Sequence, residues 1–143
     1  MKILIINGPN LNLLGTRDTG VYGTGTLKEL ESFITNNFEG HDFTFFQSNI
    51  EGEIINKLQS AMKDNTQGLI SNLGAYTHTS VALRDALEPL SFPKVEVHIS
   101  NIHAREEFRE KSLTGEVMDG IITGFGKHSY ILGVQAIEHL SKG

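Results

Sequence analysis

Two residues with complementary chemistry, Glu96 and His98, lie two positions apart in an apolar run that predicts a β-strand over residues 94–100. Side chains two positions apart in a strand share one face, so the carboxylate can orient the imidazole and raise its affinity for a proton. Both groups are costly to bury unless they are paired, and a purely structural pair is the alternative explanation. We favour a role in acid–base chemistry, because the pair lies at the carboxyl end of its strand, where ligands bind in open α/β sheets.

A second polar segment, residues 71–80, follows another predicted strand and leads into a predicted helix. It contains amides, hydroxyls and an imidazole, among them Asn72 and His78, at the edge where a sheet presents side chains to a ligand. In the simpler interpretation, Thr77, Thr79 or Ser80 caps the helix and His78 is a partly buried spectator. A capping role leaves a binding role open, because one segment can do both.

The connection after the first predicted strand, residues 7–23, is longer than the usual length of about two to six residues. Its glycines provide hinge freedom, and Arg17 and Tyr22 are the side chains in it with strong polar chemistry. Such a loop is typical of a lid that closes on a bound ligand. The segment has neither the GxGxxG pattern nor the GxxxxGK[ST] phosphate loop, so nucleotide binding has no motif to rest on. An ordinary glycine-rich turn with a surface arginine and tyrosine is the alternative.

The remaining candidate ligands do not add up to a metal site. His78 and His98 are possible metal ligands, but no third ligand occurs at a recognised spacing, so we expect no metal or other cofactor. The chain has no cysteine, which excludes a thiolate nucleophile, a disulfide and a cysteine zinc site. Three other histidines lie at helix ends or in loops without acidic companions, and we expect them on the solvated surface: His41, His128 and His139.

The elements that must position these residues follow from the apolar pattern. Runs at residues 2–7, 42–47, 68–72, 94–100 and 120–123 predict five short strands, several of them continuous rather than alternating, as in a parallel sheet covered on both faces. Helical spacing predicts one helix from the Thr26–Glu29 capping box to Phe38, others over 54–62, 81–90 and 131–140, and a short turn over 104–109.

This alternation predicts an α/β fold, a flavodoxin-like doubly wound five-stranded parallel sheet with the order 2-1-3-4-5. In such a sheet the ligand binds at the carboxyl ends of the strands, near the point where the strand order reverses. The residues that follow strands one, three and four are therefore expected to meet, which brings the three polar segments together.

The composition limits the class of protein. A length of 143 residues suits one domain, so we expect a single catalytic domain over residues 1–143. The formal charge of -5 and the absence of a run of Lys or Arg indicate no nucleic-acid partner. The four apolar residues before Asn7 are too few for a signal-peptide core or a membrane span. We expect a cytoplasmic enzyme with no membrane partner.

Several independent motifs follow one another along nearly the whole chain. They are residues 8–15 (GPNLNLLG) with Arg17 and Tyr22, residues 47–53 (QSNIEGE), 76–86 (YTHTSVALRDA), 96–101 (EVHISN) and 105–109 (REEFR), and a last turn with Gly124 and Gly126. Together they resemble the type II 3-dehydroquinate dehydratase family, whose members use no Schiff base. The chain departs from the family pattern at Leu73 in place of proline, at Asp18-Thr19 in place of Glu-Pro and at Ser129 in place of glycine. None of these changes removes a side chain that the chemistry needs.

The resemblance implies a metal-free anti elimination of water from 3-dehydroquinate to 3-dehydroshikimate through an enolate, in the shikimate pathway. By resemblance Tyr22 is the base and Arg17 the cation that favours its phenolate, because an unperturbed phenol has a pKa of about 10. His98, held by Glu96, is the general acid, and Asn10 donates to the enolate oxygen directly or through a water.

A second group of residues is implied to hold the substrate rather than to react with it. Asn72 and the backbone N–H groups of Ile99 and Ser100 hold its carboxylate, and His78 and Arg109 hold its ring hydroxyls. Asp85 reaches the site of a neighbouring subunit, because the family assembles as a homo-oligomer, a dodecamer of trimers.

Proteins of other classes offer alternatives. A flavodoxin-like module that binds FMN or a nucleotide is the main one, and it rests on fold analogy alone. A receiver-type signalling domain needs acidic residues after strands one and three, where this chain has amides such as Asn7 and Asn72. Schiff-base dehydration needs a lysine at the carboxyl end of a strand, and the lysines of this chain lie at strand starts, in helices or in loops.

Overall fold

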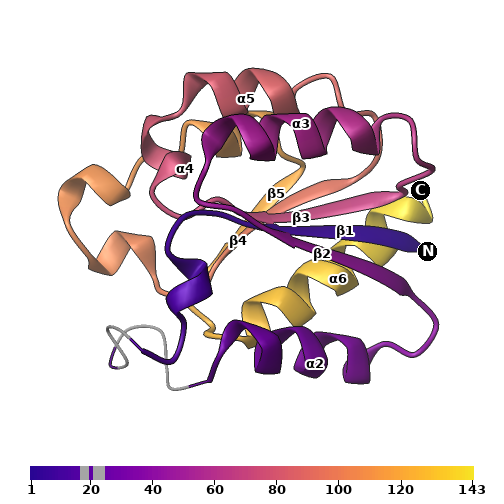
Figure 1. Cartoon of the computed structure of the whole chain (residues 1–143), viewed down its shortest axis with the longest axis horizontal. Helices are drawn as coiled ribbons and strands as arrows, with labels where there is room; N and C mark the ends of the chain where they lie inside the picture. The colour runs from indigo at the N-terminus through magenta and orange to yellow at the C-terminus, as the bar shows by residue number, and fades with distance from the viewer. Residues whose placement is uncertain (17–19, 21–24) are drawn as a thin grey trace.

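The computed structural model describes residues 1–16, 20 and 25–143, and within them five parallel strands form one sheet in the order β2-β1-β3-β4-β5 (Figure 1). The strands are β1 (Lys2–Asn7), β2 (Asp42–Gln47), β3 (Gly68–Asn72), β4 (Lys94–His98) and β5 (Gly120–Thr123). The predicted flavodoxin-like order 2-1-3-4-5 is therefore confirmed. The order reverses at β1, so the segments after β1 and β3 leave the sheet side by side.

Helices cover both faces of this sheet, as the continuous apolar strands predicted. On one face lie α2 (Leu27–Asn37) and α6 (His128–Ser141), and on the other lie α3 (Glu51–Ala61) and α5 (Val81–Leu87) (Figure 1). Each pair of helices packs on its own half of the core, with Ile5, Ile70 and Val97 on the α2–α6 face and Leu4, Ile6 and Leu69 on the α3–α5 face. Residues 3–6 of β1 are buried without interruption because both faces are covered.

Shorter elements lie near the carboxyl ends of the strands. One is a single helical turn, α4 (Tyr76–Thr79), and the others are the 3₁₀ turns η1 (Leu11–Leu13), η2 (Ile102–Ala104), η3 (Glu107–Arg109) and η4 (Thr114–Val117). The helical turn predicted over residues 104–109 is thus two 3₁₀ turns. Among the described residues, the helices are all too short or too polar to span a membrane.

The capping signals at the starts of α2 and α5 are confirmed by hydrogen bonds. Thr26 accepts a hydrogen bond from the backbone N–H of Glu29 at 3.1 Å, as the capping box predicted. Of the three proposed caps for the next helix, Ser80 is the one used, because its Oγ accepts from Leu83 N at 2.9 Å. Ser129, which stands where the family has glycine, accepts from the backbone N–H of Phe125 at 3.1 Å at the start of α6.

Two predicted elements extended too far, and two helices begin earlier than predicted, one of them α3, which begins at Glu51 and not at residue 54. The α5 helix ends at Leu87 and not at residue 90, because the buried ammonium of Lys94 donates to the carbonyls of Leu87, Glu88 and Leu90 and holds the chain in a turn. The β4 strand ends at His98 and not at residue 100, so the chain leaves the sheet at the histidine itself. The α6 helix begins at His128, before the predicted residue 131.

The expectation that His41 lacks an acidic companion was wrong. Its Nε2 lies 3.0 Å from Oε2 of Glu138, and its Nδ1 lies 3.1 Å from the amino group of Met1. The side chain of His41 is 12% exposed, so this contact is largely withdrawn from water. The companion is 97 positions away in α6, where a search for nearby acidic residues in the sequence does not reach. His128 and His139 are exposed, as predicted.

The turn that leaves β1 passes close to the turn that leaves β3. The N–H of Gly8 donates to the carbonyl of Asn72 at 2.7 Å, and a Cβ at position 8 would lie 2.4 Å from the carbonyl oxygen of Leu73. Backbone atoms cannot move aside as a flexible side chain can. Only glycine at position 8 lets these two turns meet.

We therefore predict that Gly8→Ala lowers the free energy of unfolding by about 2 kcal/mol or more, because the added methyl group forces the two turns apart. Urea unfolding followed by circular dichroism measures this change. Gly52→Ala is the control, since a Cβ there meets nothing within 4 Å and lies in the α3 helix, where alanine is favoured by about 0.5–1 kcal/mol. A Gly8→Ala protein as stable as the parent would contradict the close approach.

Candidate active site

An open cavity lies at the carboxyl ends of β1, β3 and β4, where the fold predicts a ligand site. Its empty volume, part of it shared with open solvent, is about 700 Å³. The lining residues come from the three polar segments that the sequence singled out and from the connection after β4: Pro9, Asn10, Leu11, Leu14, Asn72, Gly74, Ala75, His78, His98, Ile99, Ser100, Ile102, Arg105 and Arg109. The cavity thus gathers two imidazoles, two guanidinium groups and two carboxamides.

The Glu96–His98 pair lies at the base of this cavity, as its spacing predicted. Glu96 Oε2 is 2.8 Å from His98 Nε2, and the two residues are 0% and 5% exposed. An ionised carboxylate only accepts hydrogen bonds, so Nε2 carries the hydrogen in this contact. His98 itself lines the cavity, which leaves its other nitrogen, Nδ1, for exchange of a proton with a ligand.

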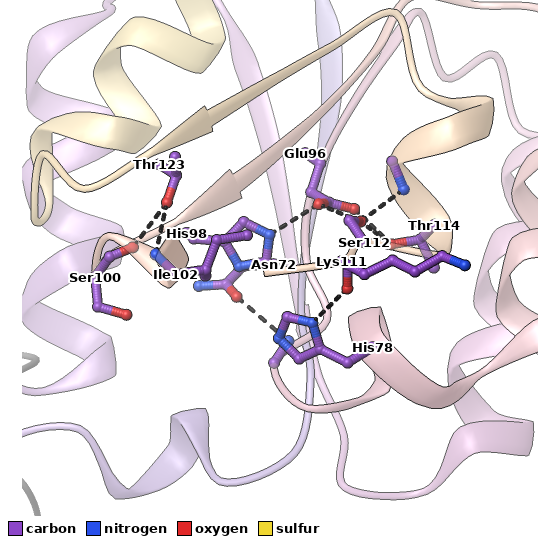
Figure 2. Close-up of polar contacts among 12 residues, drawn as sticks. Asn72, His78, Glu96, His98, Ser100, Ile102, Lys111, Ser112, Thr114 and Thr123 are labelled. Carbon is purple, nitrogen blue, oxygen red and sulfur yellow. Dashed lines mark hydrogen bonds and ion pairs between the residues drawn. The ribbon is translucent and has the colours of Figure 1, made fainter. Parts of the chain in front are cut away.

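Glu96 is further held by two hydroxyl groups that the sequence analysis missed. Ser112 Oγ donates to Oε2 at 2.8 Å, and Thr114 Oγ1 donates to Oε1 at 2.5 Å (Figure 2). Burial raises the pKa of this carboxyl, but the hydrogen bonds and charge of His98 and the hydroxyls of Thr114 and Ser112 outweigh burial and hold the pKa below its ordinary value. Glu96 is therefore a carboxylate inside the protein.

His78 lies over His98 and is fixed by the backbone. The two rings are stacked with their centroids 6.3 Å apart and their planes 22° from parallel. His78 Nδ1 lies 2.8 Å from the carbonyl oxygen of Lys111, which only accepts, so Nδ1 carries the hydrogen and Nε2 is the acceptor of the neutral ring (Figure 2). Burial lowers the pKa of His78, and the nearby His98 and Arg109 act in the same direction.

Asn72 is held from below by a tyrosine that the sequence analysis also missed. Its Nδ2 donates to the hydroxyl of Tyr130 at 2.9 Å, and that hydroxyl donates to Oδ1 of Asn7 at 2.6 Å. Tyr130 is completely buried, which raises the pKa of its phenol. Asn72 Oδ1 accepts from the N–H of Gly74 at 3.3 Å, so both ends of the carboxamide are assigned and one N–H of Nδ2 is left over. Leu73 is fully buried in the core.

Asn10 is placed by an unusual backbone conformation. Its φ of 69° lies in the left-handed region, which asparagine tolerates better than most residues. The backbone N–H of Asn10 donates to Oδ1 of Asn49 at 2.9 Å, and Asn49 is held in turn by the amide of Gln47 at 3.2 Å. The hydroxyl of Tyr76 donates to the carbonyl of Asn49 at 2.9 Å. These contacts tie the η1 turn to residues 47–49 and present Asn10 at the cavity.

The far wall of the cavity carries positive charge. Arg109 Nε donates to Oε2 of Glu106 at 2.7 Å, which fixes its guanidinium over the ring of Phe108, 4.9 Å from the ring centre. Arg105 also lines the cavity and was part of a quoted motif, but the sequence analysis gave it no role. Such a wall suits an anionic ligand.

Ile99 and Ser100 follow directly after His98 where β4 ends. The carbonyl of Ser100 accepts from Thr123 Oγ1 at 2.9 Å, and the same hydroxyl accepts from the N–H of Ile102 at 3.2 Å (Figure 2). Thr123 at the end of β5 thereby fixes the loop that carries both predicted substrate contacts. Periodicity had placed Thr123 in a strand but gave no sign of this contact.

Three predicted residues are not brought to the cavity by the described part of the chain. Arg17 and Tyr22 lie outside the described residues. Asp85 lies in α5, its side chain is 64% exposed, and it is 3.4 Å from Arg84 rather than among the lining residues. Among residues 1–16, 20 and 25–143, no three His, Cys, Asp or Glu side chains gather as a metal site would require.

Comparison with known proteins places the chain in a family. The sequence profile described as Dehydroquinase class II matches residues 1–138. The chain belongs to the class II dehydroquinase family. Four of the motifs that carry the resemblance contribute residues to the cavity, among them Asn10, His78, His98 and Arg109.

Individual relatives of this dehydroquinase cover nearly the whole chain. It is 52% identical to the 3-dehydroquinate dehydratase of Thermotoga neapolitana over 143 residues, covering 99% of this chain and 97% of that one. It is 49% identical to the 3-dehydroquinate dehydratase of Clostridium beijerinckii over 140 residues, covering 96% of each chain. The crystal structure of the type II dehydroquinase from Butyrivibrio crossotus superimposes with a TM-score of 0.94 at 45% identity, covering 96% of this chain and 97% of that one.

The buried contact beneath Asn72 in this dehydroquinase leads to a prediction. Tyr130→Phe removes the hydroxyl that bridges Asn7 and Asn72 and leaves two buried amide groups without their partner, so we expect a loss of about 1–3 kcal/mol of unfolding free energy. Urea unfolding measures the loss. Tyr76→Phe is the matched control, because its hydroxyl contact with Asn49 is exposed to water and its loss is expected to matter less. Equal losses in the two variants would contradict the role given to Tyr130.

Proposed function

We propose that this dehydroquinase removes water from 3-dehydroquinate to give 3-dehydroshikimate, in the shikimate pathway, with the whole chain as one catalytic unit. The observation that carries the proposal is the buried Glu96–His98 pair opening onto a cavity that also holds Arg109, His78 and Asn72. Such a cavity suits a small hydroxylated carboxylate, and the matched relatives carry the name of this activity.

The reaction requires a base, an acid and support for an enolate. A proton leaves the carbon next to the ketone, the electron pair forms an enolate, and the enolate expels a hydroxyl group that leaves as water once it is protonated. We assign Tyr22 as the base and Arg17 as the cation that favours its phenolate, since a phenol with a pKa of about 10 is hardly ionised at neutral pH. Asn10, which lines the cavity, is assigned to the enolate oxygen.

His98 is assigned as the general acid that protonates the departing hydroxyl. Its Nε2–H is occupied by Glu96, so the proton that it delivers is the one on Nδ1. After this transfer the ring is left neutral with its hydrogen on Nε2. The carboxylate of Glu96 favours the imidazolium that must exist before the transfer.

The remaining lining residues are assigned to positioning. Asn72, with its uncommitted N–H, and the backbone N–H groups of Ile99 and Ser100 take the substrate carboxylate, while Arg109 and the Nε2 of neutral His78 take ring hydroxyls. An acceptor at His78 Nε2 matches a hydroxyl donor. These contacts fix the C–H bond and the leaving hydroxyl relative to the acid and the base.

We further propose that the chain assembles in the cytoplasm as a dodecamer that is built from trimers. In this assembly Asp85 reaches the site of a neighbouring subunit. The exposure of the Asp85 side chain on α5, away from the cavity of its own chain, supports this assignment. Its partner Arg84 also contacts Glu88 and Glu116, so a charged surface surrounds it.

A direct assay tests the proposed function. Purified protein is mixed with 3-dehydroquinate and the absorbance of the conjugated enone product is followed in the ultraviolet. We expect turnover that neither a chelator nor borohydride treatment in the presence of substrate abolishes. An enzyme without turnover under these conditions would refute the function, and loss of activity with borohydride would indicate a lysine Schiff base.

Tyr22→Phe is expected to lower kcat by about 1000-fold or more while the fold and most substrate binding are kept, because the ring loses the oxygen that accepts the proton. The enone assay gives kcat and calorimetry gives the affinity for substrate. His139→Ala, at an exposed position of α6, is the control and is expected to behave like the parent. Near-normal turnover by Tyr22→Phe would refute the assignment of the base.

His98→Ala is expected to lower kcat by about 100- to 10,000-fold with a much smaller change in KM, because the acid is lost while the carboxylate contacts at Asn72 and the following backbone persist. Steady-state kinetics over a range of pH measures both constants. The opposite pattern, a large rise in KM at constant kcat, would make His98 a binding residue only.

A further inference from the structure

A single four-residue segment, residues 111–114, contacts both histidines of the site. The carbonyl of Lys111 accepts from His78, and the hydroxyls of Ser112 and Thr114 donate to the carboxylate that holds His98 (Figure 2). The segment precedes and enters η4, far in sequence from the β3–α4 turn and outside β4. Residues 111–114 are not among the residues that line the cavity.

The segment is itself rigidly held. Its residue Leu113 donates its backbone N–H to the carbonyl of Thr77 at 2.9 Å, which joins it to α4. Ser112 Oγ accepts from the N–H of Gly115 at 2.8 Å, so its own hydrogen is directed at Glu96. Thr114 is 0% exposed. The two hydroxyls therefore act as fixed donors rather than as mobile surface groups.

The location of one proton depends on these donors. When the buried pair holds one extra proton, that proton can lie on His98, giving an imidazolium beside a carboxylate, or on Glu96, giving a carboxylic acid beside a neutral imidazole. Hydrogen bonds that donate to both oxygens of the carboxylate stabilise the first arrangement more than the second, because a charged acceptor forms the stronger hydrogen bonds. Only in the first arrangement is His98 a strong acid toward the leaving hydroxyl.

We infer that Ser112 and Thr114 are positioning residues that keep the shared proton on His98 by occupying both oxygens of Glu96. This inference rests on the proposed function for its kinetic consequence, but the location of the proton is a property of the protein without substrate. Neither residue touches the cavity, so each acts through Glu96 and His98.

Other charged groups face the pair and must be included in any pH dependence. His78 of α4 lies over His98. Arg105 and Arg109, which belong to residues 105–109, line the same cavity. The two guanidinium groups oppose further positive charge in the cavity, whereas the ring of His78 is neutral. The partners of Glu96 in the neighbouring strands, Ser71 in β3 and Ile121 in β5, carry no charge. Glu96, held by its two hydroxyl donors, supplies negative charge beside His98, while Arg109 is paired with Glu106.

Replacement of the donors provides the test. In Thr114→Val, and more strongly with Ser112→Ala added, Glu96 becomes the better base and takes the proton, so we expect kcat to fall about 10- to 100-fold with KM within about twofold of the parent. Thr114→Ser keeps the hydroxyl and is expected to restore most of kcat. Thr66→Val is the matched control, because Thr66 Oγ1 also donates to a carboxylate, Asp64 at 2.6 Å, remote from the cavity.

Infrared difference spectroscopy of the whole protein without substrate reports the proton itself. On acidification from about pH 8 to pH 6, above the range where exposed carboxyl groups titrate, the parent should show no carbonyl band of a protonated carboxylic acid. The double variant should show one, and adding Glu96→Gln should remove it. This measurement stands even if 3-dehydroquinate is not turned over, so failure of the inference and failure of the proposed function are distinguishable.

Two results would overturn the inference. One is a double variant with kcat equal to the parent, and the other is a variant with reduced kcat but no carboxylic acid band, since the hydroxyls would then act on packing alone. If Thr114→Val unfolds, the infrared and kinetic measurements are made on Ser112→Ala alone. The side chain of Ser112 is partly exposed, so its truncation creates no closed cavity in the core.

Discussion

The structure is arranged around a carboxylate that has no contact with water. Glu96 is 0% exposed in an interior strand, and a charge in that position is tolerated only when it is paired and hydrogen bonded. His98 supplies the pair, and two hydroxyls supply the remaining hydrogen bonds. The connection between β4 and β5 is therefore constrained. Its residues 111–114 must return to Glu96 so that their hydroxyls meet this charge.

The two faces of the sheet contribute different parts of the site. Glu96 and His98 point to the face covered by α3 and α5, in register with Ser71 of β3. Asn7 and Asn72 are paired in register and point to the other face, where Tyr130 of α6 bridges them. The proton-transfer groups and the carboxamide thus have separate supports that meet only at the carboxyl ends of the strands. Changes in one support need not disturb the other.

The sequence allowed the sheet, its order and the central pair to be predicted, because each depends on a local pattern. Continuous apolar runs identify covered parallel strands, and a spacing of two places Glu96 and His98 on one face. Family motifs extended this to Asn10, Asn72, His78 and Arg109, which all line the cavity. The roles assigned to the site residues remain predictions, and Tyr22 and Arg17 lie outside the described part of the chain.

The groups that support the site were not predictable in the same way. Ser112 and Thr114 lie in an irregular segment whose spacing follows neither a helix nor a strand, and the hydroxyl of Tyr130 lies in a helix that reads as ordinary amphipathic sequence. The contact between His41 and Glu138 joins residues 97 positions apart and was missed for the same reason. These contacts are created by the fold, so they can be read only once the chain is folded.

The bridge from Tyr130 to Asn7 spans 123 positions and has a consequence for biosynthesis. Translation delivers β1 before α6, so Asn7 and Asn72 wait for their shared hydroxyl until α6 has left the ribosome. A nascent chain can pair its strands before then, but the carboxamides of Asn7 and Asn72 still lack their contact with the hydroxyl of Tyr130. Bringing together two residues this far apart costs loop-closure entropy, so support of Asn72 requires α6 to be made and packed on the sheet.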